Sequence, residues 1–177
     1  TTVTHPMLST SQLPKISQRE VETSEFDYLS VVGSLLHIAN CVRCDVALAV
    51  GILARHGLNP GKAHVRACKR VVMYLYNTRT LGITFHRTSV NGERNVPRMH
   101  EGAQHPLDDG INKLQIFADS DYAADETRRS THGSVILMNG GPISWSSTLG
   151  KTVATSTCEA EINAAVAAAK DAVHINR

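Results

Sequence analysis

The chain has 177 residues, of which 42% are hydrophobic and 19% charged, a balance typical of a globular protein and not of a disordered or fibrous one. Eighteen Lys and Arg against sixteen Asp and Glu give a formal net charge of +2, so the overall charge neither requires nor excludes a nucleic-acid partner. No run approaches the roughly 20 apolar residues that span a bilayer, and we expect no membrane partner. Four Cys are too few for a disulfide scaffold and are interpreted as reduced intracellular thiols.

Residues 1–25 contain Pro, Ser and Thr without hydrophobic periodicity, so we expect an extended lead-in there. Its start, Thr1 to Pro14, has neither the basic flank nor the apolar run of a signal peptide. The absence of an initiator Met favours a fragment or a processed product.

A helical region is predicted over residues 26–87. Its first helix begins near Tyr28 and places apolar residues on one face, at Tyr28, Val31, Val32, Leu35, Ala39 and Val42. A second segment has four apolar residues on one side, at Val46, Ala49, Val50 and Leu53. Asn59-Pro60-Gly61 then predicts a turn.

A third helix is predicted from Lys62 to Asn77. Its inward face is expected to carry His64, Cys68, Val71, Val72 and Leu75. The other side carries four basic residues, Lys62, Arg66, Lys69 and Arg70. We take these as candidate nucleic-acid-binding residues that would contact phosphates as non-specific charges. A solvated helix face explains the same pattern equally well.

Residues 88–113 are polar and punctuated by Gly and Pro, which predicts a linker loop at a domain boundary. Over 114–177 the pattern predicts three strands, at Leu114–Ala118, His132–Met138 and Ile143–Ser147. The second strand is apolar on both faces, which favours a central position. Asn139-Gly140-Gly141-Pro142 predicts a hairpin turn, and an Ala-rich helix is expected to begin near Ser156.

Asp119-Ser120-Asp121 falls where the first of these strands is predicted to end. Carboxylates at a strand terminus can hold a hard divalent cation, because Mg²⁺ takes oxygen ligands and keeps several waters. The alternative is a solvated turn, in which Asp is a common turn former.

Two acidic residues open the last helix, and the sequence gives them different roles. Ser156-Thr157-Cys158-Glu159 matches the capping box S-x-x-E, in which Ser156 accepts from the Glu159 amide and the Glu159 side chain reaches back to the Ser156 amide. Glu161 has no such role.

Small residues follow Glu161 on its own face of the helix, at Ala165, Ala168 and Ala172. They predict close packing on the sheet, and the rest of the contact is expected from Ile162, Val166, Ala169 and Val173. A carboxylate at the edge of a packed face is costly unless a cation or hydrogen-bond donors meet it. The alternative for Glu161 is a helix-terminal acid favoured by the helix dipole.

Four motifs follow one another in this half of the chain: Phe117-Ala-Asp-Ser-Asp-Tyr-Ala123, Arg128-Arg-Ser-Thr-His-Gly133, Ile143-Ser-Trp-Ser146 and Ser156-Thr-Cys-Glu-Ala-Glu161. In this order and spacing they resemble the ribonuclease H of copia-type retrotransposons. The first half resembles the helical stretch that joins the reverse transcriptase to the ribonuclease H in the same Pol polyproteins. The segments that carry this second resemblance are Tyr28-Leu-Ser-Val-Val-Gly-Ser-Leu-Leu-His37, Arg43-Cys-Asp-Val-Ala47, and Lys69-Arg-Val-Val-Met-Tyr-Leu75 followed by Thr78.

The resemblance implies a mixed α/β fold, with an N-terminal helical segment and then an incomplete ribonuclease H-like domain of three antiparallel strands and a following helix. It implies hydrolysis of the RNA strand of RNA–DNA hybrids with two Mg²⁺ ions about 3.5–4 Å apart. Asp119 would bridge the metals and Glu161 would ligate one of them, as catalytic residues. The implied partners are the hybrid and the rest of the Pol polyprotein. The implied location is the cytoplasm, in the element's virus-like particle, or the nucleus.

Departures from the family pattern limit what the chain itself is expected to do. The family's third and fourth acidic ligands lie in a later strand and a later helix, and the chain ends at Arg177, before either. Asp171 lies ten residues beyond Glu161, about 15 Å along a helix axis, too far to share its site. We therefore expect an active parent enzyme and an inactive chain. The alternatives are a catalytically dead nucleic-acid-binding remnant and an inert pseudogene product.

Cys41-Val-Arg-Cys44 suggests a different metal site, with zinc ligands completed from His56, His64 or Cys68. No second C-x-x-C pair follows, and both Cys fall within a helical pattern. Packing thiols are therefore the favoured interpretation.

Overall fold

A computed structural model of the chain describes residues 3–7, 13–16, 26–85, 114–123 and 127–176. The predicted linker over 88–113 lies outside these residues, as does most of the predicted lead-in over 1–25. Within the described part of the chain, no helix is long and apolar enough to cross a membrane.

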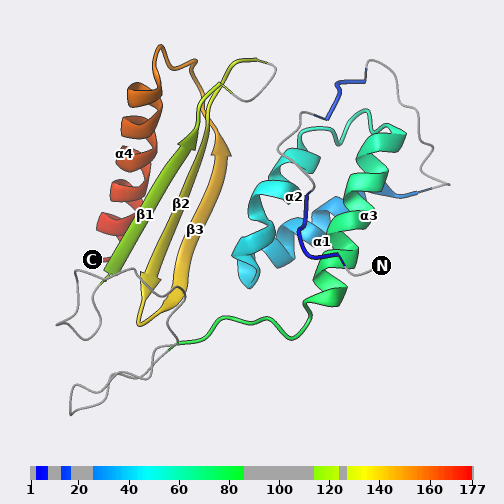
Figure 1. Ribbon diagram of the computed structural model, residues 1–177, viewed down its shortest axis with the longest axis horizontal. Coiled ribbons are helices and arrows are strands. Elements are labelled where there is room, and N and C mark those ends of the chain that lie inside the picture. The colour runs from blue at the N-terminus through cyan, green and yellow to red at the C-terminus, as the bar shows by residue number, and fades with distance from the viewer. Residues whose placement is uncertain (1–2, 8–12, 17–25, 86–113, 124–126, 177) are drawn as a thin grey trace.

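The helical lobe consists of α1 (Tyr28–Cys41), the 3-10 turn η1 (Cys44–Val46), α2 (Ala47–Ala54) and α3 (Lys62–Asn77), shown in Figure 1. The start of α1 is capped by Asp27, whose carboxylate accepts a hydrogen bond from the Ser30 amide at 3.2 Å. Gly61 precedes α3 in an extended conformation, and its amide donates to His64 Nδ1 at 2.8 Å. The predicted bounds of α3 are confirmed.

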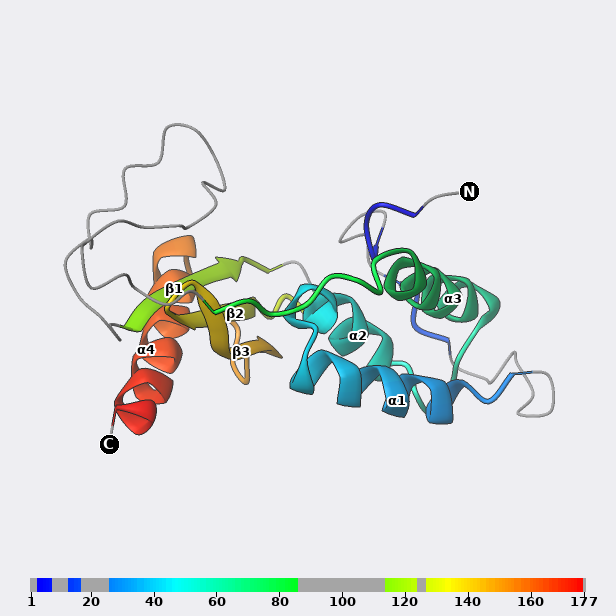
Figure 2. The same cartoon turned by 90° about the horizontal axis from the view of Figure 1, so that it is seen from below.

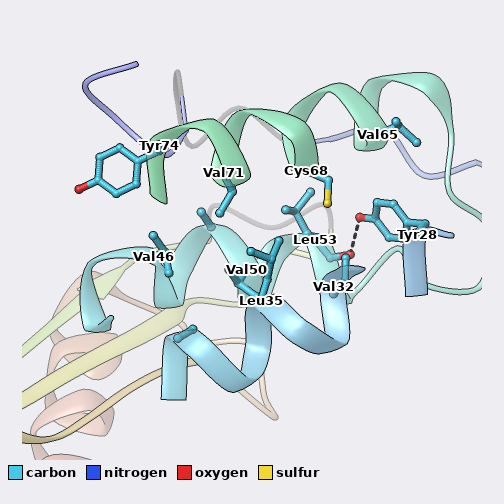
Figure 3. Close-up of a cluster of buried hydrophobic side chains, with 12 residues drawn as sticks. Tyr28, Val32, Leu35, Val46, Val50, Leu53, Val65, Cys68, Val71 and Tyr74 are labelled. Atoms are coloured by element: carbon cyan, nitrogen blue, oxygen red, sulfur yellow. Dashed lines mark hydrogen bonds between the residues drawn. The ribbon is translucent and has the colours of Figure 1, made fainter. Parts of the chain in front are cut away.

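Buried side chains from all three helices form one core between them (Figure 3). Tyr28 is fully buried, and its hydroxyl donates to the Leu53 carbonyl at 2.8 Å. Desolvation, with a smaller contribution from Cys68, raises the pKa of this hydroxyl. The core therefore joins the first turn of α1 to the end of α2.

Two residues assigned to this core by periodicity lie outside it. Val42 is 53% exposed because α1 ends at Cys41 and the chain turns away there. Val72 is 43% exposed, and Tyr74 is buried on α3 where the sequence analysis placed no core residue. Tyr74 faces inward because its hydroxyl bonds to Asp45.

The sheet lobe contains an antiparallel sheet of β1 (Leu114–Asp121), β2 (Thr131–Met138) and β3 (Gly141–Leu149), with β2 in the centre. The central position of β2 is thus confirmed. The β2–β3 turn is tighter than predicted, because Asn139 and Gly140 both have positive φ, 51° and 80°, and Gly141 already belongs to β3. Such a pair of positive φ angles suits a two-residue hairpin turn.

Helix α4 (Thr157–Ile175) packs on β1 and β2 through four buried alanines spaced four residues apart, Ala160, Ala164, Ala168 and Ala172. The predicted packing face was wrong in part, because Ala165 is exposed and the larger side chains face away from the sheet. Ile162, for example, is 56% exposed. Small side chains occupy the contact because they let the helix backbone approach the strands closely.

The two lobes meet through β3, which packs against α2 and η1. Trp145 on β3 donates its indole N–H to the Ala39 carbonyl of α1 at 2.7 Å. Figure 2 shows the sheet lying between α4 and the helical lobe. The predicted fold class is confirmed: the chain is mixed α/β, with a helical segment, three antiparallel strands and a following helix, consistent with a partial ribonuclease H-like fold.

Candidate functional site

The sequence analysis placed Asp119 at the end of the first strand. In the structure, Asp119 lies within β1, which continues to Asp121. The strand continues because Ser120 and Asp121 pair with His132 and Thr131 of β2, and the Ser120 hydroxyl lies 3.3 Å from His132 Nδ1. Directly opposite Asp119 is Gly133, which has no side chain to cover the strand there. The Asp119 carboxylate is exposed near the end of the sheet where β1 finishes.

The start of α4 shows how its two acidic residues differ. Ser156 Oγ accepts from the Glu159 amide at 3.1 Å, which confirms half of the predicted capping box. The other half was wrong by one residue: Glu159 Oε2 accepts from the amide and the hydroxyl of Thr155, at 2.6 and 2.7 Å, and not from Ser156. Both bonds lower the pKa of Glu159, and the bond from the Thr155 hydroxyl has the larger effect.

Glu161 borders the buried Ala160 but is itself exposed. Among the described residues it has no hydrogen-bond or ion-pair partner. It lies beside the packed face and not on it, so the expected cost of burying its charge does not arise. The fold gives Glu159 a structural role and leaves Glu161 available for another.

The structure brings Asp119 and Glu161 to the same end of the sheet lobe, because α4 begins where β1 ends and packs against it (Figure 1). Two exposed carboxylates suit Mg²⁺, which binds oxygen ligands and retains waters. The described residues contain no group of three or more His, Cys, Asp or Glu able to hold a metal ion. Among the described residues, these two carboxylates would therefore supply only some of the ligands of such a site.

The suggested zinc ligands likewise form no metal-binding group of three or more among the described residues. Cys41 is exposed at the end of α1, whereas Cys68 is buried in the helical core. Desolvation raises the pKa of the Cys68 thiol to about 11, so the thiol stays protonated at neutral pH. A protonated thiol is a poor metal ligand, and Cys68 serves the core as a small apolar residue.

The basic side of α3 is partly engaged in the fold. Lys62, Arg66 and Lys69 are exposed, and Arg70 is half-buried. Lys69 Nζ lies 5.4 Å from the centre of the Phe26 ring, within the range of a cation–π contact. The Arg70 Nε is buried and has no hydrogen-bond partner within the described residues.

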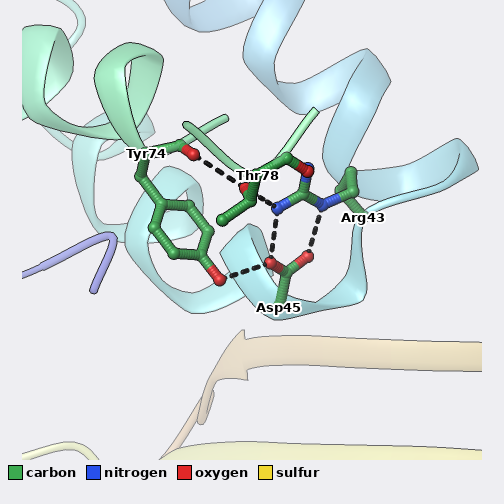
Figure 4. Close-up of polar contacts among 4 residues, drawn as sticks. All are labelled: Arg43, Asp45, Tyr74 and Thr78. Carbon is green, nitrogen blue, oxygen red and sulfur yellow. Dashed lines mark hydrogen bonds and ion pairs between the residues drawn. The ribbon is translucent and has the colours of Figure 1, made fainter. Parts of the chain in front are cut away.

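A polar network that the sequence analysis missed joins η1 to the end of α3 (Figure 4). Arg43 binds the Asp45 carboxylate through Nε at 2.9 Å and through one terminal nitrogen at 2.8 Å. The same guanidinium donates to the Thr78 carbonyl and hydroxyl, at 3.1 and 2.6 Å. Tyr74 donates its hydroxyl to Asp45 at 2.8 Å.

Arg43 is only 7% exposed, so its charge depends on this network. Burial alone would raise the pKa of the Asp45 carboxyl, but hydrogen bonds from Arg43 and Tyr74 and the Arg43 charge outweigh it and lower the pKa. The pKa of Arg43 is raised in return, chiefly by its hydrogen bond to Asp45. The segments that carry these residues were visible in the sequence as family-like motifs, but nothing local indicated that they meet.

Comparisons with known proteins find relatives of two kinds, a secreted effector protein and retrotransposon Pol polyproteins. The chain is 37% identical to Secreted RxLR effector protein 161 of Plasmopara viticola over 147 residues. This alignment covers 82% of the chain and 89% of the effector protein. It is 33% identical over 174 residues to the retrovirus-related Pol polyprotein from transposon TNT 1-94 of Nicotiana tabacum, 98% of the chain but 11% of the polyprotein. The polyprotein from transposon RE1 of Arabidopsis thaliana is 30% identical over 160 residues, 90% of the chain and 9% of its own length.

The chain thus spans about a tenth of the Pol polyproteins that it matches. No family model matches it. No solved structure matches it either.

Proposed function

The chain belongs to the family of retrotransposon Pol polyproteins, and we propose that it comprises the end of a copia-type reverse transcriptase and the first part of the adjoining ribonuclease H domain. The four ordered motifs support this reading. So does their placement, since they lie on β1, at the start of β2, on β3 and at the start of α4.

We propose that the parent polyprotein hydrolyses the RNA strand of RNA–DNA hybrids. The observation that carries this is the position of Asp119 and Glu161 at one end of the sheet lobe, both exposed and neither needed by the fold. The two carboxylates would hold Mg²⁺, which supplies an activated water and neutralises charge at the cleaved phosphate. Their own contribution is to present oxygen ligands from a strand and a helix that are fixed against each other.

Cleavage of a labelled RNA–DNA hybrid by the parent polyprotein tests this proposal. Asp119→Asn and Glu161→Gln are each expected to abolish the Mg²⁺-dependent cleavage, whereas Glu159→Gln, next to the site but engaged with Thr155, is expected to retain it. Equal loss in all three variants would indicate misfolding. Full activity of Asp119→Asn would refute the proposed function.

A second function is favoured by the small ligand set. The described residues offer no group of three metal-binding side chains, and we propose that the chain by itself binds nucleic acid without cleaving it. Salt-sensitive binding of the hybrid without cleavage is the expected behaviour of the 177-residue chain. Cleavage by this chain that is lost in Asp119→Asn would overturn that expectation. The proposed partners in the element are the hybrid and the rest of the polyprotein, within a virus-like particle.

A further inference from the structure

Exposed cations border the candidate carboxylates at one end of the sheet. Asp121, the last residue of β1, pairs with Thr131, where β2 begins, and Thr131 pairs with Leu149, where β3 ends. Arg128 and Arg129 lie three and two residues before the start of β2, and Lys151 lies two residues after the end of β3. All three side chains are exposed. In Figure 1 this is also the end at which α4 begins.

A backbone hydrogen bond fixes these cations relative to one another. The Gly150 amide donates to the Ser130 carbonyl at 2.8 Å, so the segment after β3 is held beside the segment before β2. Ser130 is 1% exposed, and its hydroxyl accepts from the Ala123 amide at 3.3 Å. Arg129 and Lys151 each lie one residue from this bond, on the two segments that it joins. The arrangement is therefore set by the fold and not by two independent loops.

Arg128 adds a conformational argument. Its φ is 58°, in the left-handed region where glycine is favoured and most other residues are strained. Within the described residues the Arg128 side chain makes no hydrogen bond or ion pair that would offset this strain. An unfavourable backbone conformation kept at an exposed residue points to a function of its side chain.

Electrostatics indicates what that function is. A nucleic acid that approaches Asp119 and Glu161 brings phosphates toward carboxylates, and like charges repel. Cations beside the carboxylates offset this repulsion, and each Lys or Arg that contacts a phosphate also releases counterions.

We propose that Arg128, Arg129 and Lys151 bind backbone phosphates of the RNA–DNA hybrid and hold it at the carboxylate end of the sheet, an inference that rests on the proposed function. The basic side of α3 lies in the other lobe, so the two surfaces make different predictions (Figure 2).

The test measures binding of the RNA–DNA hybrid to the 177-residue chain by fluorescence anisotropy. EDTA is present so that no cleavage occurs. The logarithm of the binding constant falls with the logarithm of the salt concentration, and removing one phosphate contact reduces the magnitude of this slope by about one. Arg128→Gly with Arg129→Ala is expected to lower the slope by about two, and Lys151→Ala by about one. Between about 50 and 200 mM salt, the affinity of the unmodified chain should fall about 12-fold more than that of the double variant.

Two controls separate binding from charge and from folding. Arg79→Ala with Lys170→Ala removes the same charge after α3 and from the second half of α4, and it should leave the slope unchanged. Arg128→Gly is expected to keep or raise the melting temperature, because glycine adopts this φ freely. A chain that is no less stable and yet binds more weakly cannot be explained by misfolding.

Two outcomes would overturn the inference. One is an equal loss of slope in Arg128→Gly with Arg129→Ala and in the control Arg79→Ala with Lys170→Ala, which would mean that only the net charge matters. The other is an unchanged slope in Arg128→Gly with Arg129→Ala but a lower one in Lys62→Ala with Arg66→Ala, which would place the hybrid on α3. Either result leaves the proposed function standing if Asp119→Asn still abolishes cleavage by the parent. Retained cleavage in Asp119→Asn, with the expected slopes, would reject the proposed function alone.

Discussion

Arg43 is a nearly buried cation whose every terminal nitrogen has a partner. Nε and one terminal nitrogen bind Asp45 as a fork, and both terminal nitrogens bind Thr78. A buried charge is tolerated only when it is paired in this way, because removing one partner leaves an uncompensated charge in a medium of low polarity. The network therefore fixes the end of α3 to the turn between α1 and α2.

Asp45→Asn is expected to destabilise the chain by about 2 kcal/mol, because the amide keeps one acceptor and turns a donor toward Arg43 or Tyr74. Tyr74→Phe removes only the hydroxyl bond to Asp45 and should cost about 1 kcal/mol. Urea unfolding followed by circular dichroism at neutral pH measures both. Equal stability of Asp45→Asn and the unmodified chain would show that the network is not needed for stability.

The same variant predicts a pH dependence. Because the pKa of Asp45 is lowered in the folded chain, folding favours its ionised form. The stabilisation is therefore complete above the unfolded pKa of about 4 and is lost as the pH falls through the lower folded value. The stability difference between the unmodified chain and Asp45→Asn should stay constant from about pH 7 to 5 and shrink toward pH 3. A constant difference down to pH 3 would contradict the lowered pKa.

At the scale of elements, α4 shows why its packing face was only partly predicted from the sequence. The Ala-rich helix has weak amphipathicity. Ala168 and Ala172 were placed correctly on the sheet side, but the larger Ile162 and Val166 were wrongly expected to complete the contact. Contact with a sheet instead selects the side on which the backbone comes closest, and that side carries alanines at every fourth position, beginning at Ala160. By contrast, α3 was predicted well because the Asn59-Pro60-Gly61 turn marks its start and its polar and apolar sides differ strongly.

The capping residues of α4 and Glu161 should respond differently to substitution. Ser156→Ala removes the acceptor of the Glu159 amide and is expected to cost about 1 kcal/mol of stability. Glu161→Ala removes an exposed side chain without a partner among the described residues and should change stability by less than about 0.5 kcal/mol. Thermal unfolding of the two variants provides the comparison. A marked loss of stability in Glu161→Ala would mean that Glu161 has a structural role, and it would weaken its assignment as a metal ligand.

At the scale of the whole molecule, the sequence indicated two regions but not how they join. The carboxylates could be selected because a local capping pattern distinguishes Glu159 from Glu161. The joint could not, because it connects residues far apart in the chain: Trp145 with Ala39, and Arg43 with Thr78. Such pairs leave no periodic signal, so only the folded chain shows that three of the family-like motifs, those that contain Arg43, Thr78 and Trp145, have a structural role.

Trp145 gives the joint a measurable strength. The Ala39 carbonyl is among the last four of α1, which lack partners within a helix, and the indole N–H supplies one. Trp145→Phe keeps an aromatic ring but leaves this carbonyl unsatisfied, so we expect a loss of about 1–2 kcal/mol in urea unfolding. Trp145→Ala also removes the ring and should cost more, about 3 kcal/mol or above. If the Trp145→Phe variant were as stable as the unmodified chain, the hydrogen bond would not hold the lobes together, and ring packing alone would account for the contact.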